Sequence, residues 1–213
     1  MPAMGQRTSK GAVVHVVDDD AGMRTALGRL LQAEGYQVRT YASAGAFLLA
    51  EPLEGPACVL LDVRMPGPSG LELQQSLARQ ETPPPIIFLT GHADIPMTVR
   101  ALKAGAADFL TKPVQRQTLL LAVEAALAKD AAHRAELTEL RSLRARYDTL
   151  TAREREVFSR VIAGRLNKQI AADLGAAERT VKAHRARVME KMQAGSLAEL
   201  VTLAQRLTLP PRS

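Results

Sequence analysis

The stretch that most constrains the fold is residues 57–67, Ala-Cys-Val-Leu-Leu-Asp-Val-Arg-Met-Pro-Gly. Its first five residues are apolar, which is typical of a parallel strand buried on both faces. The run ends on one carboxylate, Asp62, and Pro66 and Gly67 predict a turn soon after it. Because open α/β sheets hold ligands at the carboxyl ends of their strands, Asp62 lies where a binding site is expected. A solvated strand-end residue is the alternative, and this stretch alone does not decide between them.

The N-terminal half alternates apolar runs with segments of helical periodicity. Strands are predicted at 12–17, 36–41, 57–61, 86–89 and 108–111. Helices are predicted at 21–34, 43–50, 69–80, 94–104 and from 115 onward. Five βα units in this order predict an α/β fold with a doubly wound, five-stranded parallel sheet.

Size and composition favour two domains. The chain has 213 residues, and a domain usually takes ~100 to 200. Cys58 is the single cysteine, so a disulfide framework is excluded and a reducing cytoplasm is the expected location. Residues 1–10 are expected to form a disordered tail. No apolar run approaches the ~18 residues that span a bilayer, so a membrane is not expected as a partner.

Charge divides the chain into two unlike parts. Residues 1–128 carry 11 Lys and Arg against 12 Asp and Glu, for a net charge of −1. Residues 129–213 carry 17 against 10, for a net charge of +7. A basic excess confined to the C-terminal part predicts a polyanionic partner for that part.

Polar groups follow four of the predicted strands. In strand order they are Asp18, Asp19 and Asp20, then Asp62, then Thr90 and Gly91, then Lys112. Crowded carboxylates repel one another unless a cation lies among them, and oxygen ligands suit Mg²⁺. A lysine and a hydroxyl at the same edge are the groups that a transferred phosphoryl group needs. Each residue alone has an ordinary structural explanation, so their joint placement is what indicates a site.

Four segments resemble the receiver domain of two-component response regulators. They are H-V-V-D-D-D at 15–20, V-L-L-D-V-R-M-P-G-P-S-G at 59–70, F-L-T-G-H at 88–92 and D-F-L-T-K-P at 108–113. The resemblance covers residues 11–128 and implies a flavodoxin-like fold. It also implies that Asp62 accepts a phosphoryl group from a sensor histidine kinase.

The same resemblance assigns roles to the residues around Asp62. It implies that Mg²⁺ is held by Asp18, Asp19, Asp62 and the backbone carbonyl of Arg64. The phosphoryl oxygens would contact Thr90 and Lys112, and Phe109 stands where such domains carry an aromatic switch residue. A shift of Thr90 and Phe109 would reshape the face of helix 94–104. On that face a dimer interface is expected to include Met97, Val99 and Ala101.

Two alternative functions remain open. Phosphatases of the haloacid dehalogenase type also attack through a strand-end aspartate, but they need a second aspartate two residues later. This chain has Arg64 there, so the sequence favours a phosphate acceptor over an enzyme with turnover. The other alternative is a transcription regulator that binds DNA without being phosphorylated.

Residues 129–148 are predicted to form a linker helix that continues the last helix of the receiver domain. Helix-breaking residues are almost absent, and an apolar stripe falls at spacings of three and four. Its members are Leu137, Leu140, Leu143, Tyr147 and Leu150. The stripe favours packing within the chain over a coiled coil, because the repeat lasts about two heptads.

Residues 149–208 predict four short helices. Thr151 and Glu154 form the pattern of a capping box, which opens a helix at 152–163. The other helices are predicted at 167–174, at 178–192 and after Gly195-Ser196. Short helices joined by glycine-containing turns, in a basic segment, are typical of a helix-turn-helix DNA-binding domain.

The helix at 178–192 is expected to have an apolar and a basic face. At about 100° per residue, the buried face carries Val181, His184, Val188 and Met192. The opposite face carries Arg179, Lys182, Ala183, Ala186 and Arg187, from which base or groove contacts are expected. Thr180 is a further candidate DNA contact. Backbone phosphates are expected to contact Asn167, Lys168, His184 and Arg185 at the flanks. The alternative is a solvated basic helix face with no ligand.

Three segments are similar to the LuxR-type output domain. They are L-T-A-R-E-R-E-V at 150–157, G-R-L-N-K-Q-I-A at 164–171 and T-V-K-A-H-R-A-R-V-M-E-K-M at 180–192. With the receiver segments, they resemble regulators of the FixJ/NarL group, and the long linker resembles the styrene and toluene regulators within it. The resemblance implies a transcription regulator that dimerises on phosphorylation and binds double-stranded DNA, with RNA polymerase as a further partner.

Two positions depart from the LuxR-type pattern. Ala177 stands where the family usually has the Ser or Thr N-cap of the recognition helix. A cap worth about 1 kcal/mol is therefore expected to be missing. Leu166 likewise replaces a small polar residue.

Overall fold

The structure is a computed structural model that describes residues 11–50, 55–91 and 95–208. The expected N-terminal tail, residues 1–10, lies outside the described residues. The chain divides into two units, Met1–Ala135 and Glu136–Ser213. One helix, α5 (Arg116–Asp148), belongs to both, so the last helix of the first unit continues into the linker as predicted.

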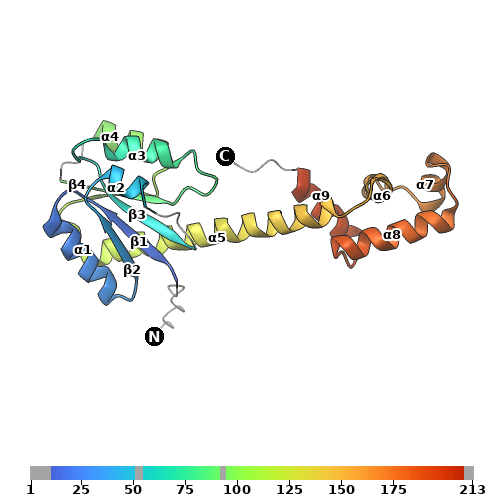
Figure 1. Ribbon diagram of the computed structural model, residues 1–213, viewed down its shortest axis with the longest axis horizontal. Helices are drawn as coiled ribbons and strands as arrows, with labels where there is room; N and C mark the ends of the chain where they lie inside the picture. Colours follow the sequence, from blue (N-terminus) through green and yellow to red (C-terminus); the bar gives the residue numbers. More distant parts are fainter. Residues whose placement is uncertain (1–10, 51–54, 92–94, 209–213) are drawn as a thin grey trace. The chain divides into compact units, whose positions relative to one another are not determined.

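The sheet of the first unit is parallel throughout, with the strand order β2-β1-β3-β4-β5. Its strands are β1 (Val13–Val17), β2 (Gln37–Tyr41), β3 (Ala57–Asp62), β4 (Ile86–Thr90) and β5 (Asp108–Thr111). This order confirms the predicted doubly wound sheet (Figure 1). All six residues of β3 are buried, because the strand has a neighbour on each side and helices over both faces.

Helices cover both faces of this sheet. Leu31 of α1 (Ala21–Ala33) and Val123 of α5 belong to the core on one face. The core on the other face includes residues of α2 (Ala44–Leu48), α3 (Gly70–Leu77) and α4 (Ile95–Lys103). Figure 1 shows α3 and α4 above the sheet and α1 below it. Neighbouring residues of β1 and β3 alternate between the two cores, as the period of two in a strand requires.

Capping residues set where the helices of the first unit begin and end. Asp20 accepts hydrogen bonds from two backbone N–H groups of the first turn of α1, at 2.7 and 3.1 Å. Ser69 and Glu72 form a capping box at the start of α3. After α1, Gly35 has a φ of 89°, a conformation that favours glycine and lets the chain turn back toward β2.

A buried carboxylate ties α5 to the sheet. Asp130, 3% exposed, accepts a hydrogen bond from the backbone N–H of Ala57 at 2.8 Å. Its Oδ2 also accepts from Arg134 Nε at 2.7 Å. Because Ala57 begins the strand that Asp62 ends, α5 is fixed to the central strand that carries this carboxylate.

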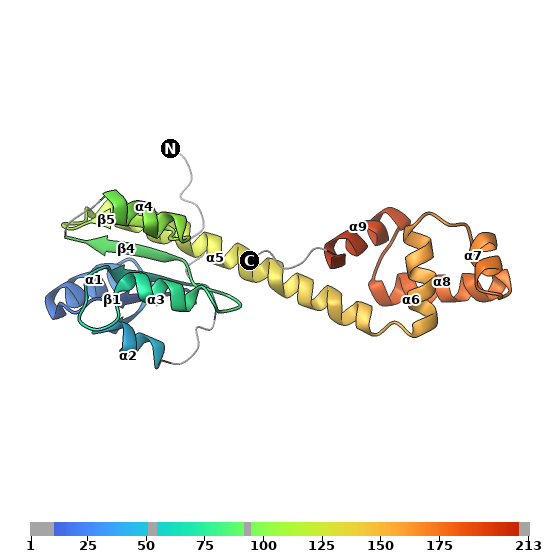
Figure 2. The same cartoon turned by 90° about the horizontal axis from the view of Figure 1, so that it is seen from above.

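Over residues 136–208, the second unit contains the last turns of α5 and four further helices (Figure 2). They are α6 (Ala152–Ile162), α7 (Asn167–Asp173), α8 (Glu178–Met192) and α9 (Leu197–Thr208). Leu143 of α5 is 1% exposed and lies in the core of this unit, with Tyr147 packed against it. The linker stripe therefore packs within the chain at its C-terminal end. No helix over the described residues has the length and apolarity to cross a membrane.

Candidate functional site

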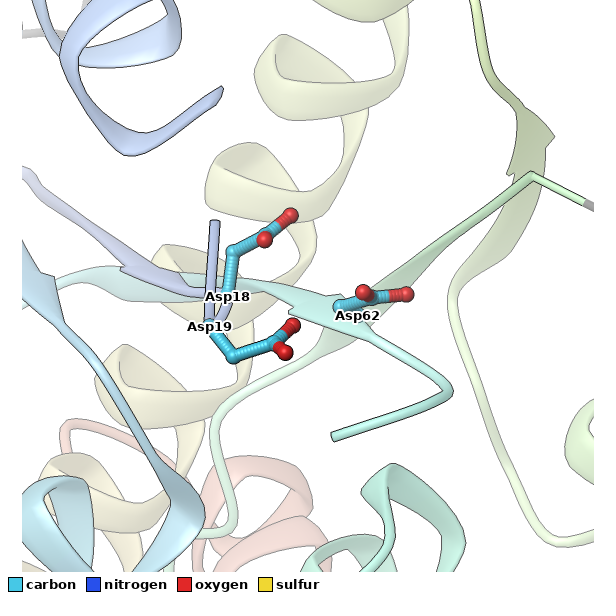
Figure 3. A group of neighbouring side chains, drawn as sticks. All are labelled: Asp18, Asp19 and Asp62. Carbon is cyan, nitrogen blue, oxygen red and sulfur yellow. The ribbon is translucent and has the colours of Figure 1, made fainter. Parts of the chain in front are cut away.

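Three carboxylates meet at the carboxyl edge of the sheet. Asp18 and Asp19 follow β1, Asp62 ends β3, and one carboxylate oxygen of each lies within 4.8 Å of the others. Figure 3 shows the three side chains gathered at the ends of these adjacent strands. Asp18 and Asp62 are buried, whereas Asp19 is exposed. The cluster is therefore open to solvent on the Asp19 side.

Lys112 supplies a positive charge to this cluster. Its Nζ lies 2.6 Å from Asp18 Oδ2 and 3.3 Å from Asp62 Oδ2. Its backbone N–H donates to the carbonyl of Thr90 at 2.7 Å, and Thr90 itself is buried at the end of β4. Burial acts to lower the pKa of Lys112, but the hydrogen bond and charge of Asp18, together with Asp62, raise it above its ordinary value. Lys112 is therefore cationic at neutral pH.

The environment of Asp62 combines burial with a fixed cation. Burial raises the pKa of the Asp62 carboxyl, the charge of Lys112 opposes this effect, and the charge of Asp18 adds to it. The backbone N–H of Arg64 donates to Asp62 Oδ1 at 3.4 Å, and the Arg64 side chain is exposed. These contacts hold the Asp62 carboxylate in a defined position.

The third consecutive aspartate, Asp20, has a different role. Its side chain caps α1, and the hydrogen bonds from the backbone N–H groups of Met23 and Gly22 lower the pKa of Asp20. Arg24 Nη1 donates to the backbone carbonyl of Asp18 at 2.7 Å and fixes the turn. The sequence does not distinguish the capping aspartate from its two neighbours, because all three have the same chemistry.

The connection from β3 to α3 approaches Asp62 closely. A Cβ atom at Gly70 would lie 2.5 Å from the backbone oxygen of Asp62 and 3.1 Å from Phe88 Cε1. Glycine is therefore required for α3 to begin directly beside the strand end. Residues of this connection and Met97 of α4 line an open pocket of about 500 Å³.

The structure corrects one expectation about α4. Ala101 is completely buried, so the prediction that it joins a dimer interface is wrong. Its small side chain faces the core, and its backbone carbonyl accepts a hydrogen bond from Gln74 Nε2 of α3 at 3.1 Å. Val99 is exposed, whereas Phe109 is half-buried with its ring centroid 6.0 Å from that of Phe88.

The predicted faces of α8 are confirmed by burial. Val181, Val188 and Met192 are buried, and His184 is half-buried. The exposed residues are Arg179, Thr180, Lys182, Ala183, Ala186 and Arg187. As expected, Ala177 provides no side-chain cap for α8. Leu166 provides none for α7.

The flanking polar residues lie next to this surface. Arg185 Nη1 donates to Asn167 Oδ1 at 3.2 Å and links α8 to the first residue of α7. Lys168 is exposed on the first turn of α7. The second unit thus presents cations and small residues together over two adjacent helices, an arrangement that suits a DNA groove.

The capping box of α6 carries a second interaction that the sequence pattern does not indicate. Glu154, 2% exposed, accepts hydrogen bonds from the backbone N–H of Thr151 at 2.9 Å and from Lys191 Nζ at 2.6 Å. The hydrogen bond from Lys191, with that from Thr151, lowers the pKa of Glu154 to about 2. This ion pair fixes the end of α8 against the start of α6.

The chain matches two protein families in succession. Residues 14–124 match the family described as "Response regulator receiver domain". Residues 148–204 match the family described as "Bacterial regulatory proteins, luxR family".

Characterised relatives are similar over nearly the whole chain. "Nodulation protein W" of Bradyrhizobium diazoefficiens is 47% identical over 93% of this chain and 88% of its own. "Transcriptional regulatory protein FixJ" of the same organism is 43% identical over 93% of this chain and 97% of its own. The solved structure of the response regulator StyR is 46% identical, with a TM-score of 0.85 over 92% of this chain and 98% of that one. The chain therefore belongs to the response regulators of the FixJ/NarL group, with a receiver domain followed by a LuxR-type DNA-binding domain.

Proposed function

We propose that Asp62 is the phosphoacceptor of this regulator and that a sensor histidine kinase is the donor. The main support is the position of Lys112 Nζ, which lies 3.3 Å from Asp62 Oδ2 and 2.6 Å from Asp18 Oδ2. A fixed ammonium group at this position offsets the negative charge that a phosphoryl group brings to Asp62. The receiver domain would span residues 11–128, the linker helix 129–148 and the DNA-binding domain 149–208.

The chemistry of the transfer is a substitution at phosphorus. An oxygen of the Asp62 carboxylate attacks the phosphorus of a phosphohistidine and forms a P–O bond. The P–N bond breaks, its electron pair leaves with the imidazole, and the imidazole takes up a proton. The product is an acyl phosphate on Asp62. Arg64 occupies the position of the acid/base aspartate of haloacid dehalogenase phosphatases, so repeated turnover on phosphate esters is not expected.

The residues around Asp62 also fit Mg²⁺. Asp18, Asp19 and Asp62 each offer a carboxylate oxygen within 4.8 Å of the others, and the backbone carbonyl of Arg64 would add a fourth protein oxygen. A hard cation that prefers oxygen ligands and retains water suits such an open group. When bound, Mg²⁺ offsets charge on the phosphoryl oxygens. Lys112 Nζ donates to Asp18 Oδ2 at 2.6 Å and so fixes the Asp18 carboxylate.

Readout of the phosphoryl group is assigned to Thr90 and Phe109. Thr90 would contact a phosphoryl oxygen, and Phe109 would fill the space that Thr90 leaves. The surface that changes is that of α4, on which Ile95, Val99 and Leu102 are exposed. Exposed apolar side chains on one helix favour a protein partner, and a second phosphorylated copy of the chain is the proposed one.

The phosphorylated dimer would bind double-stranded DNA through α8. Direct contacts to bases or the groove floor are assigned to Arg179, Thr180, Lys182, Ala183 and Arg187. Phosphate contacts are assigned to Asn167, Lys168, His184 and Arg185. RNA polymerase is proposed as a further partner at the promoter.

Labelled phosphate transfer tests this function directly. The full chain is incubated with ³²P-labelled acetyl phosphate and Mg²⁺, and the protein-bound label is assayed for the alkali lability of an acyl phosphate. The wild-type chain and the control Asp20→Asn should take up label, because asparagine also caps a helix. Asp62→Asn should take up none. Equal labelling of Asp62→Asn would place the phosphate elsewhere.

A further inference from the structure

The C-terminal end of α8 has an unusual backbone conformation. Among the described residues, Gln193 is the one non-glycine residue with a positive φ, at 56°. It terminates α8 in the left-handed conformation that glycine normally occupies at a helix end. A side chain there is strained, and such a conformation persists where neighbouring groups hold it.

Arg146, in the last turn of α5, is the group that holds this end. Its Nη1 donates to the backbone carbonyl of Met192 at 3.0 Å and to Gln193 Oε1 at 3.1 Å. A guanidinium group beside the last carbonyls of a helix also offsets the negative end of the helix dipole. Both the strained residue and the last helical residue of α8 are therefore bonded to the end of the linker helix.

A second set of contacts runs in the opposite direction. Lys191 of α8 donates to the backbone carbonyl of Thr149, just beyond α5, at 3.0 Å. Thr149 Oγ1 in turn donates to the carbonyl of Arg146 at 2.7 Å. The end of α8 and the end of α5 thus form a closed set of directional hydrogen bonds.

The opposite end of α8 lacks comparable support. Ala177 supplies no side-chain cap, although Arg179 and Lys182 near that end carry the proposed DNA contacts. Apolar packing through Val181 and Val188 anchors the middle of the helix, where Arg185 also bonds Asn167 of α7. The hydrogen bonds that join α8 to the linker helix are therefore concentrated at the C-terminal end of α8.

We infer that Arg146 is a positioning residue for DNA recognition: by bonding Met192 and Gln193 it fixes the orientation of α8 on the end of the linker helix. This inference rests on the proposed DNA-binding function and deepens it. Arg146 itself is not a DNA contact. It acts through the backbone of α8. Its loss should reduce sequence specificity more than it reduces non-specific affinity for DNA.

The test compares Arg146→Ala with Arg144→Ala, which removes an equal charge from an exposed position on the same helix. The probes are a duplex that the wild-type chain selects from a random-sequence pool and a scrambled duplex of the same composition. The selection and the affinity measurements use the full chain with beryllofluoride and Mg²⁺, at a temperature where circular dichroism shows every variant folded. The readout is the ratio of the two affinities.

Arg146→Ala should lower this ratio by about fivefold or more, since two hydrogen bonds to a charged donor are lost. Arg144→Ala should leave the ratio unchanged. Arg146→Lys keeps the charge but not the position of the donor nitrogen, so it should restore part of the ratio. An unchanged ratio in Arg146→Ala would overturn the inference, as would an equal loss of affinity for both duplexes.

If Arg146→Ala does not fold, Arg146→Lys decides: a reduced ratio supports the inference and a wild-type ratio overturns it. A wild-type chain that prefers no sequence in the selection would refute the proposed function and this inference together. If both Arg146 variants keep the wild-type ratio, the inference is wrong and the proposed function is unaffected.

Discussion

Lys112 Nζ lies 3.3 Å from Asp62 Oδ2, although Asp62 ends β3 and Lys112 follows β5. The same ammonium lies 2.6 Å from Asp18 Oδ2, so one cation links the ends of β1, β3 and β5. Its position leaves Asp19 exposed at the side where the cluster meets solvent. Lys112 therefore offsets the charge of Asp18 and Asp62, whereas Asp19 faces solvent, where a cation can approach.

This arrangement predicts that magnesium stabilises the folded chain. A ligand that binds only the folded state raises the melting temperature, and about ten dissociation constants of Mg²⁺ should raise it by about 3 to 6 °C. Asp19→Asn should lose most of this shift because it removes a carboxylate ligand, whereas Asp20→Asn should keep it. Differential scanning fluorimetry with and without chelator gives the shifts, and equal shifts in both variants would contradict the site.

Two glycine substitutions should act in opposite directions. Gly70→Ala places a Cβ 2.5 Å from the backbone oxygen of Asp62, so we expect a loss of about 2 kcal/mol or more in the free energy of unfolding. Gly28 lies within α1, and its added Cβ would meet Thr40 Cγ2 at 3.9 Å, an ordinary contact. Gly28→Ala should therefore raise the free energy of unfolding by about 0.5 to 1 kcal/mol. Urea unfolding of both variants measures the difference, and a harmless Gly70→Ala would contradict the close approach.

Stability should fall with acidification through the titration of His15. Burial, with a smaller effect of the Arg39 charge, lowers the pKa of His15 from 6.5 to about 4. Its Nδ1 lies 3.1 Å from the Tyr41 hydroxyl, and its ring packs against Tyr41 and Phe47. His15 takes up a proton near pH 6.5 in the unfolded chain but only near pH 4 in the folded chain. The stabilisation is therefore complete above pH 6.5 and is lost as the pH falls toward 4.

The shift corresponds to about 3 kcal/mol across this range. Urea unfolding of the wild-type chain and of His15→Gln at several pH values isolates the contribution, since glutamine does not titrate. The difference between the two free energies should shrink as the pH decreases from 7 to 4. Parallel profiles would show that His15 is not the responsible group.

Lys191 should matter more to the second unit than an exposed lysine of the same helix. Lys191→Met leaves Glu154 buried without its partner at 2.6 Å and should cost about 2 kcal/mol, because Lys191 is partly exposed. Lys182→Met should change the free energy of unfolding by less than about 0.5 kcal/mol. Hydrogen exchange of the α6 and α8 amides gives both values, and equal effects would contradict the role of the ion pair.

The sequence predicts those parts of the structure that leave a periodic or positional signal. The apolar run at 57–61 identifies a central strand, and each strand end places its polar residue at one edge. Helical periodicity separates the buried Val181 and Val188 from the exposed Lys182. These inferences need nothing beyond neighbouring positions in the chain.

Pairs that join distant segments leave no such signal. The hydrogen bond from Ala57 to Asp130 and the contact of Arg146 with Met192 depend on how helices pack. Neither partner stands out in its own segment, since Asp130 and Arg146 resemble ordinary polar residues of a long helix. The expectation for Ala101 fails for a local reason. Residues two apart lie on opposite sides of a helix, so Ala101 cannot share a face with the exposed Val99.

DNA binding with and without a phosphoryl mimic tests the central claim most directly. The affinity of the full chain for the selected duplex is measured by fluorescence anisotropy at fixed salt, before and after addition of beryllofluoride with Mg²⁺. The wild-type chain should bind about tenfold more tightly with the mimic, within the usual range of coupling between two sites, and Asp62→Asn should not respond. Unaltered affinity of the wild-type chain, or equal tightening of Asp62→Asn, would contradict control of DNA binding through Asp62.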